Sequence, residues 1–468
     1  MIYQKRQENH LFYLHDVWLY NVKSMLKRVL IANRGEIAVR IIRTCKELGL
    51  KTVAVYSEAD RDSMHVKLAD RSICIGPAEP SKSYLDIPRI MSAIEISDAD
   101  AVHPGYGFLA ENPRFAEIVT ASKKIFIGPS AKALELIGDK IKAKEVAKKL
   151  GIPLVPGSDG CVSLQEAVEV ANKIGYPVVI KASAGGGGRG IRVVRNEKEL
   201  REKLPLAIEE AKIAFGDGRV YIEKYIINPK HIEVQVLADR YGNVVALGER
   251  ECSIQRRNQK LIEEAPSSFV DDTLRKQLEE ATVEFCKSIN YEGAGTVEFL
   301  VDQDGKFYFM EMNGRIQVEH PVTEMITGID IVKWQIKIAK GEKVSVRSVE
   351  RRGCAIEFRI NAEDSNTFMP TPGKIDELYL PGGFGVRIDT HIYCGYTVPP
   401  YYDSLLAKLI VWGEDRRSAI KRAKRALEEF VISGQSLRTN IEFHKRVIST
   451  REFMEGKHHI KFIEEMMM

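Results

Sequence analysis

The sequence predicts a chain of several α/β and α+β domains, and three observations support this. At 468 residues it exceeds what one hydrophobic core usually supports, so two or three domains are expected. Its first part alternates apolar strands with amphipathic helices, which is typical of a parallel sheet covered by helices. Farther along, a Gly-rich stretch between two strands and an acid-bearing hairpin indicate an α+β arrangement.

Composition narrows the classes of function. The 69 Lys and Arg against 65 Asp and Glu leave a net charge of +4, so nucleic acid is not an expected partner. The seven cysteines form no C-x-x-C pair, which argues against a zinc site or a disulfide framework and favours a reducing cytoplasm. We predict no membrane span, because no window reaches the roughly 18 apolar residues required. Residues 1–24 do not resemble a signal peptide.

The N-terminal part is expected to be a parallel sheet. A helix over 35–48, with apolar residues at helical spacing, follows the first strand. The turn 33–36 is not the G-x-G-x-x-G fingerprint, so NAD binding has little support. We predict strands at 27–32, 52–56, 71–75, 101–103 and 125–128.

A second domain is predicted to begin after a helix over 140–150. The strand 176–182 carries Lys181 near its end, the Gly-rich stretch 183–190 follows, and 191–194 is another strand. Glycines let backbone N–H groups approach phosphate oxygens, and the lysine adds charge at the same anion. We therefore favour a phosphate-covering flap over a flexible linker. The stretch lacks the G-K-[ST] of a P-loop, so a different ATP architecture is indicated.

The hairpin of strands 296–301 and 306–310 bears the densest chemistry. Glu298, Glu311 and Asn313 offer the hard oxygen ligands that Mg²⁺ or Mn²⁺ prefers, with nucleotide phosphates completing the shell. Arg315 and Glu319, four residues apart, suit a small planar anion with a base beside it. The alternative is an ordinary hairpin with its acids in water.

Further elements are predicted around this hairpin. Charge density alone indicates that 249–266 is a solvated loop. We predict strands at 219–225, 231–237 and 354–362, and helices at 272–289, 330–339 and 416–430.

The stretch GTVEFLVDQDGKFYFMEMNGRIQVEHPVTE, from Gly295 to Glu324, closely resembles the metal and bicarbonate site of biotin carboxylase, a member of the ATP-grasp superfamily. The resemblance extends from Met25 to about Met454. It implies an ATP-grasp fold with an N-terminal α/β domain at 25–138, a linker helix and mobile Gly-rich lid at 139–227, and a C-terminal mixed domain at 228–454. Residues 455–468 are a tail, and 1–24 are an extension of unassigned function, expected to be an upstream-start artefact or a poorly ordered tail.

The resemblance also implies a reaction, the ATP-dependent carboxylation by bicarbonate of biotin held on a separate carrier protein, through carboxyphosphate. The implied catalytic residues are Lys260, Arg315, Glu319 and Arg359, with Arg359 facing biotin. Bicarbonate is assigned to Lys260, Arg315, Gln317 and Val318, and the metal to Glu298, Glu311 and Asn313. The implied ATP-binding residues are Lys140, Lys181, Gly187, Gly188, Glu223, Ile226, His231, Gln255, Glu298 and Glu311.

Two positions depart from the family pattern. Gly314 stands where Thr or Pro is usual, and Asn258 stands where some members have His. Neither removes a charge that the chemistry requires.

The resemblance also implies partner proteins, and rival functions stay open beside it. It implies a homodimer that works with a biotinylated carrier protein or a biotinylated carboxyltransferase subunit. The biotin carboxylase of an acetyl-CoA carboxylase and that of a two-subunit pyruvate carboxylase would look alike. Another ATP-grasp carboxylate–amine ligase is the rival enzyme, and a nucleotide-sensing regulatory protein is the non-enzymatic alternative.

Overall fold

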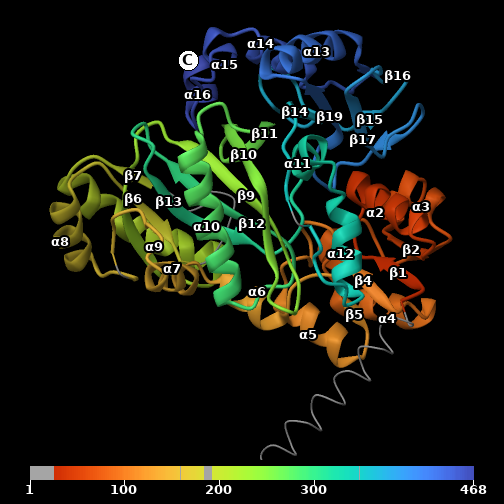
Figure 1. The fold of residues 1–468 in the computed structure, drawn as a ribbon, viewed down its shortest axis with the longest axis horizontal. Helices are drawn as coiled ribbons and strands as arrows, with labels where there is room; N and C mark the ends of the chain where they lie inside the picture. Colours follow the sequence, from red (N-terminus) through yellow and green to blue (C-terminus); the bar gives the residue numbers. More distant parts are fainter. Residues whose placement is uncertain (1–25, 159, 184–191, 347, 468) are drawn as a thin grey trace, which may run out of the picture.

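The computed structural model describes residues 26–158, 160–183, 192–346 and 348–467. Three parts make up the fold: an N-terminal α/β part, a projecting lid and a large part built on an antiparallel sheet (Figure 1). Gly187, Gly188 and the extension 1–24 lie outside the described residues. The predicted multidomain fold is confirmed.

The N-terminal part is a five-stranded parallel sheet in the order β3-β2-β1-β4-β5. Its central strand β1 is almost wholly buried, because helices cover both faces of a parallel sheet. The predicted strands are confirmed to within two residues at each end. The strands are β1 Arg28–Ile31, β2 Lys51–Tyr56, β3 Arg71–Cys74, β4 Ala101–His103 and β5 Ile125–Phe126, and the helices are α2 Gly35–Glu47, α3 Met64–Leu68, α4 Ile87–Ser97, α5 Pro113–Ala121 and α6 Ala131–Gly138.

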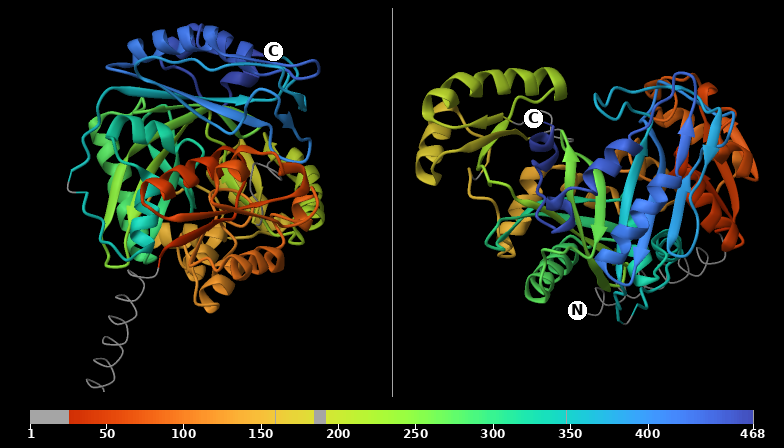
Figure 2. Two further views of the ribbon diagram at one scale, coloured as in Figure 1. Left: turned by 90° about the vertical axis from the view of Figure 1, so that its right-hand side faces the viewer. Right: turned by 90° about the horizontal axis from the view of Figure 1, so that it is seen from above.

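The lid has a core of its own and projects from the body, as the view from above shows most clearly (Figure 2). A three-stranded antiparallel sheet, β7-β6-β8, packs against α8 and α9. Every second residue of these strands belongs to one apolar cluster with the helices: Val178, Ile180 and Ala182 of β6, and Val220 and Ile222 of β8. The elements are α7 Lys140–Lys149, which leads in, α8 Leu164–Ile174, β6 Val178–Ala182, β7 Arg192–Val194, α9 Glu197–Phe215 and β8 Val220–Lys224.

The remainder is organised by an eight-stranded antiparallel sheet in the order β13-β12-β9-β10-β11-β14-β19-β17. Its strands are β9 Lys230–Ala238, β10 Val244–Arg256, β11 Gln259–Ala265, β12 Gly293–Val301, β13 Phe307–Asn313, β14 Cys354–Asn361, β17 Val386–Thr390 and β19 Leu405–Gly413. The helices are α10 Asp272–Ser288, α11 His320–Thr327, α12 Ile331–Ala339, α13 Arg416–Glu429, α14 Ile441–Val447, α15 Arg451–Met454 and α16 Phe462–Met466. Two small ladders pair β15 Gly373–Lys374 with β18 Thr397–Val398 and β16 Glu377–Tyr379 with β20 Val431–Ser433.

Residues 249–266 do not form the solvated loop that their charge density alone indicates. The segment forms the end of β10 and all of β11, in the middle of the large sheet, and most of its charged side chains are buried. Arg250 is fully buried and pairs with Glu233 on β9. High charge density therefore marked a buried ion-pair network, because buried acids of this segment pair with cations of other elements, Glu249 with Arg275 on α10 and Glu264 with Arg416 on α13.

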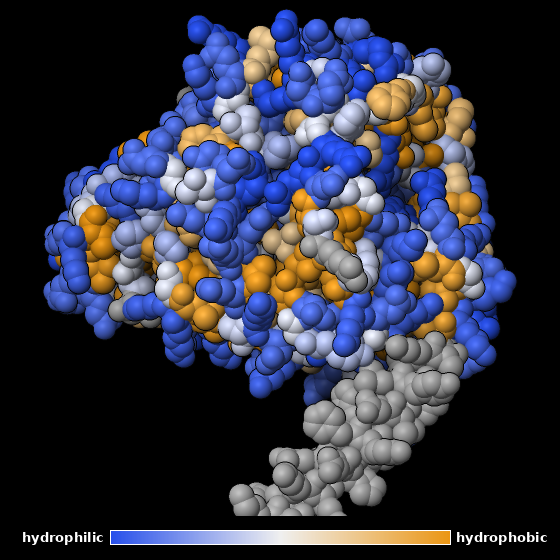
Figure 3. Space-filling view, in the orientation of Figure 1, coloured by the Kyte–Doolittle hydropathy of each residue, from blue (hydrophilic) through white to orange (hydrophobic). Residues whose placement is uncertain are grey.

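The C-terminal segment 455–468, predicted as a tail, includes α16, which packs against β10. The imidazole of His458 lies 2.9 Å from the buried carboxylate of Glu251, and Ile463 is fully buried. On the face shown in Figure 3, hydrophilic residues cover most of the surface and hydrophobic residues form separate patches. Among the described residues, no helix has the length and apolar character to cross a membrane.

Candidate active site

A cavity of about 1010 Å³ lies where the three parts meet. Arg34 and Tyr106 reach it from the N-terminal part, and Tyr402 reaches it from the loop before β19. The predicted residues that line it are Lys140, Lys181, Glu223, His231, Gln255, Lys260, Glu298, Glu311, Asn313, Arg315, Gln317, Val318 and Arg359. Two predicted residues that the structure describes are not among those lining the cavity: Ile226, which is half-buried just after β8, and Glu319, which is fully buried.

Glu298 and Glu311 face one another across the β12–β13 hairpin. They are directly paired residues of the ladder, and Asn313, opposite Thr296, donates from Nδ2 to Glu298 Oε1 at 2.9 Å. Cross-strand neighbours have Cβ atoms about 5 Å apart, which is close enough for both carboxylates to share one ion. This all-oxygen donor set fits Mg²⁺ or Mn²⁺.

Neighbouring donor groups contact both carboxylates. Lys140 Nζ lies 3.0 Å from Glu311 Oε2, and His231 Nε2 lies 3.0 Å from Glu298 Oε2. Burial alone would raise the pKa of Glu298, but Lys260 and His231 more than offset it and hold that pKa well below its usual range. The side chain is therefore ionised at neutral pH, as a metal ligand must be.

Lys260 contacts three acids of the site. From β11 its ammonium lies 3.0 Å from Glu298 Oε1 and 2.7 Å from Glu319 Oε1, and it also pairs with Glu233. These three acids raise its pKa well above the usual value, although burial acts in the opposite direction. Lys260 thus links Glu298, a candidate metal ligand, to Glu319, the candidate base.

Arg315 is held by three different groups. Its Nε donates to Glu111 Oε2 at 2.8 Å, its Nη1 to Gln317 Oε1 at 2.7 Å and its Nη2 to Asn313 Oδ1 at 3.1 Å. Glu111 also accepts from the Gly314 N–H at 2.9 Å. The sequence did not reveal Glu111, which is about 200 positions away and has no motif around it.

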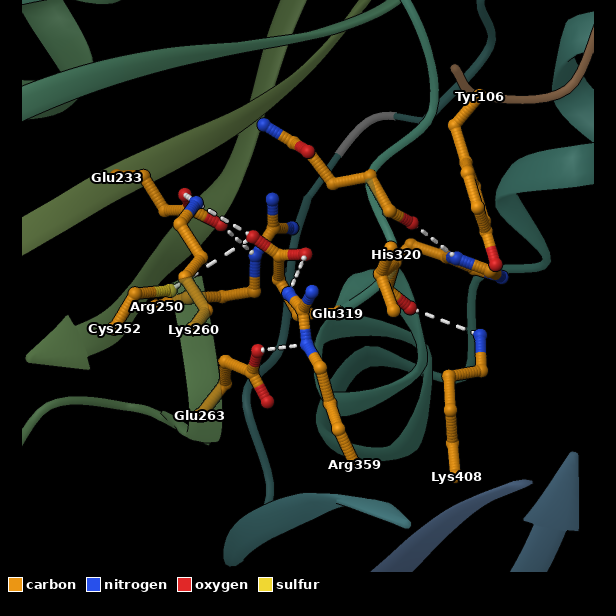
Figure 4. A network of polar contacts seen from close by, with 12 residues as sticks. Tyr106, Glu233, Arg250, Cys252, Lys260, Glu263, Glu319, His320, Arg359 and Lys408 are labelled. Carbon is orange, nitrogen blue, oxygen red and sulfur yellow. Dashed lines mark hydrogen bonds and ion pairs between the residues drawn. The ribbon is translucent and has the colours of Figure 1, made fainter. Parts of the chain in front are cut away.

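Glu319, just before α11, is fully buried between two cations. Arg359 Nη2 lies 3.0 Å from its Oε2, opposite Lys260 on Oε1 (Figure 4). Burial would raise the pKa of Glu319, but Lys260 and Arg359 prevail and hold it well below the usual value. Arg359 Nε in turn donates to Glu263 Oε1 at 2.6 Å, and this second acid was not predicted.

At the lid, Glu223 is buried rather than exposed. Lys181 Nζ lies 2.6 Å from its Oε2, and Lys144 pairs with its other oxygen. Burial opposes ionisation, but these two lysines lower the pKa of Glu223 to about 2. Lys144 was missed, although it lies one helical turn after Lys140 and so on the same face of α7.

His231 and Gln255 lie on neighbouring strands. Gln255 Nε2 is 2.9 Å from His231 Nδ1, which leaves the other ring nitrogen facing Glu298.

The two departures from the family pattern have local causes. Asn258 has φ +64° in the two-residue turn between β10 and β11, where Asn is well tolerated. A Cβ on Gly314 would lie 2.6 Å from Ile137 Cδ1 and 2.9 Å from Leu134 Cδ2, so a larger residue there would require these side-chain ends on α6 to move.

Three protein-family models match successive parts of the chain. The family "Biotin carboxylase, N-terminal domain" matches residues 25–134, "Carbamoyl-phosphate synthase L chain, ATP binding domain" matches 139–347, and "Biotin carboxylase C-terminal domain" matches 357–465. A biotin carboxylase of Haemophilus influenzae is 55% identical over 445 residues, covering 94% of this chain and 99% of that protein. A pyruvate carboxylase subunit of Methanothermobacter thermautotrophicus is 52% identical, covering 94% and 90%.

Solved structures agree. A Campylobacter jejuni biotin carboxylase in a complex described as "beta-gamma-ATP" superimposes with a TM-score of 0.91 at 52% identity, covering 94% of this chain and 98% of that one. The biotin carboxylase domain dimer of Hydrogenobacter thermophilus 2-oxoglutarate carboxylase, with MgADP, ADP and bicarbonate, gives a TM-score of 0.90 at 51% identity, covering 94% and 97%.

Proposed function

The chain belongs to the biotin carboxylase family, and on this premise we propose which residues carry each part of the reaction. It is a ligase-type carboxylase that uses ATP and bicarbonate to carboxylate biotin. The observation that carries the assignment is the position of Lys260, which touches Glu298 on the metal side and Glu319 on the base side.

On the ATP side, the lysines neutralise phosphate charge so that two anions can meet. Lys140 and Lys181 enter the cavity from α7 and β6, and both are paired with acids in this state. When bound at Glu298 and Glu311, the divalent ion would supply further charge neutralisation at the phosphates. His231, Gln255 and Glu223 are assigned to the nucleotide.

On the bicarbonate side, Arg315, Lys260, Gln317 and the Val318 backbone form the anion site. The Val318 N–H has no hydrogen-bond acceptor among residues 26–158, 160–183, 192–346 and 348–467, and Val318 lines the cavity. A bicarbonate oxygen attacks the γ-phosphorus, ADP leaves with the bonding electrons, and carboxyphosphate forms.

Glu319 is assigned as the base that takes the bicarbonate proton. Its low pKa makes it a weak base while both Lys260 and Arg359 contact it. When bicarbonate and biotin bind, Lys260 and Arg359 turn from Glu319 to these substrates. The loss of their positive charges raises the pKa of Glu319, so that it accepts the proton. Phosphate released from carboxyphosphate takes the N1′ proton of biotin. Arg359, once it has left Glu319, then stabilises the resulting biotin enolate.

We further propose a carrier protein bearing the biotin, a homodimer and a cytoplasmic location. The relative that belongs to a multi-subunit carboxylase supports the carrier, the dimeric neighbour supports the homodimer, and the free cysteines among the described residues support the location.

The test is ADP release from MgATP with and without bicarbonate and free biotin, comparing wild type with Glu319→Gln and Arg359→Ala. We expect turnover that depends on bicarbonate and rises with biotin, a loss of about 10² or more in Glu319→Gln, and loss of the biotin stimulation in Arg359→Ala. Turnover indifferent to biotin would contradict the acceptor, and an active Glu319→Gln enzyme would contradict the base.

A further inference from the structure

The turn that joins β13 to α11 provides both the proposed bicarbonate contact and the proposed base. Gln317, Val318 and Glu319 lie outside any strand, so no sheet ladder holds their peptide groups. Two buried side chains contact their carbonyl oxygens (Figure 4), and the backbone N–H of His320 also donates to the Gln317 carbonyl at 3.4 Å. His320 Nδ1 lies 2.7 Å from the Gln317 carbonyl oxygen, and Lys408 Nζ, from β19, lies 2.9 Å from the Val318 carbonyl oxygen.

The first of these bonds controls the Val318 N–H. The Gln317 carbonyl and the Val318 N–H belong to one planar trans peptide unit, so they point in opposite directions. Whatever fixes the carbonyl therefore fixes the direction of the N–H. A donor on the carbonyl oxygen also polarises the unit and strengthens its N–H as a donor.

His320 is suited to this task. It is fully buried, and because a carbonyl can only accept, Nδ1 must carry the hydrogen. Burial first, and then the positive charges of Lys408, Arg40 and Arg387, hold the pKa of His320 well below its usual value. The ring is therefore a neutral donor at neutral pH and adds no charge beside the anion site.

Lys408 fixes the next peptide unit. Its side chain is fully buried, and Nζ also lies 3.1 Å from Glu36 Oε1 on α2, whose carboxylate accepts a hydrogen bond from Tyr106. In Figure 4, Lys408 and His320 lie on one side of Glu319 and Lys260 lies on the other. The peptide units on both sides of Val318 are thus tied to the protein interior.

We propose that His320 is a positioning residue, which aims and polarises the Val318 N–H toward bicarbonate, while Lys408 fixes the following peptide unit. This inference rests on the proposed bicarbonate site. A purely structural histidine would affect every substrate alike, whereas a positioning histidine affects bicarbonate selectively.

Two variants with the same functional group separate these roles. In His320→Asn the carboxamide nitrogen takes the place of Nδ1, and in His320→Gln it lies one methylene farther out, near the place of Nε2. We expect the KM for bicarbonate in ADP release to stay within about threefold of wild type in His320→Asn and to rise about tenfold in His320→Gln, with the KM for ATP unchanged in both.

Equal effects of the two variants, or parallel changes in the KM values for bicarbonate and ATP, would overturn the proposal. Lys260→Met in the same assay separates this failure from failure of the site itself. An unchanged bicarbonate KM in Lys260→Met means that the bicarbonate site is misplaced, and the inference falls with it. A raised KM there, with none in His320→Gln, means that only the positioning role is wrong.

If His320→Gln does not fold, ¹⁵N NMR of histidine-labelled wild-type protein tests the same point, with His320→Asn providing the assignment. The proposal requires hydrogen on Nδ1 and a bare Nε2. The opposite tautomer would overturn it.

Discussion

Replacing Lys408 by Met should strongly destabilise the protein, because the buried carboxylate of Glu36 would lose its cation. The Lys408 ammonium is fully buried, 3.1 Å from Glu36 Oε1 and 2.9 Å from the Val318 carbonyl oxygen. Methionine keeps most of the volume but leaves the Glu36 carboxylate buried without its cation. Removing one partner of a buried pair typically costs about 3 to 5 kcal/mol, because the other charge remains uncompensated.

The effect is measured as the midpoint of thermal unfolding. For a domain of about 150 to 250 residues, a loss of about 1 kcal/mol lowers the unfolding midpoint by roughly 2 to 4 °C. The midpoint of Lys408→Met should therefore fall by on the order of 10 °C. Adding Glu36→Gln to Lys408→Met removes the stranded charge and should restore a large part of the loss. Lys421→Met, at an exposed position on α13, is the matched control and should change the midpoint by no more than about 2 °C.

Two results would refute this reasoning. One is a Lys408→Met protein that melts within about 2 °C of wild type. The other is a double variant no more stable than Lys408→Met, since the loss would then come from packing rather than from the unpaired Glu36 carboxylate.

Three other changes test separate features. Gly314→Thr should lower the unfolding midpoint because its Cβ would lie 2.6 Å from Ile137 Cδ1, and adding Ile137→Ala should recover part of the loss; no recovery would contradict the clash. Burial, opposed by Arg359, raises the pKa of Glu263 from 4.5 to about 7. The stability that the protonated Glu263 side chain contributes is therefore fully present below pH 4.5 and is lost as pH rises through 7. The midpoint of Glu263→Gln minus that of wild type should therefore grow with pH across this window, and a flat difference would contradict the raised pKa. Glu311→Gln should increase the Mg²⁺ concentration for half-maximal ADP release at least about tenfold, whereas an unchanged value would remove Glu311 from the metal site.

In the proposed mechanism, Lys260 and Arg359 leave Glu319 for bicarbonate and biotin, and other acids lie beside both cations. Glu233 and Glu298 contact Lys260, and Glu263 contacts Arg359. They keep Lys260 and Arg359 charged and in place before substrates arrive. A buried cation without such partners would lose its proton or unfold the site.

The sequence could predict the elements whose signal is local. The hairpin around Glu298 and Glu311, the strand bearing Lys181 and the helix beginning at Lys140 are each specified by periodicity, a turn or a cap within about 15 residues. The liganding types within a single stretch, from Glu311 to Glu319, were visible for the same reason. The roles of the remaining site residues came from family resemblance.

Partners that are distant in sequence could not be predicted from it. Glu111 binds Arg315 from 204 positions away, Glu263 binds Arg359 from 96 and Lys408 holds the Val318 carbonyl from 90. Charge density misled for 249–266, because composition does not say whether a charge meets water or an opposite charge on the next strand. By itself, the sequence determined which residue types are available for the chemistry and how they are spaced locally, since both are written in it. Only the tertiary structure decided which charges neutralise one another and where each N–H points, because these depend on which strands of the sheet become neighbours.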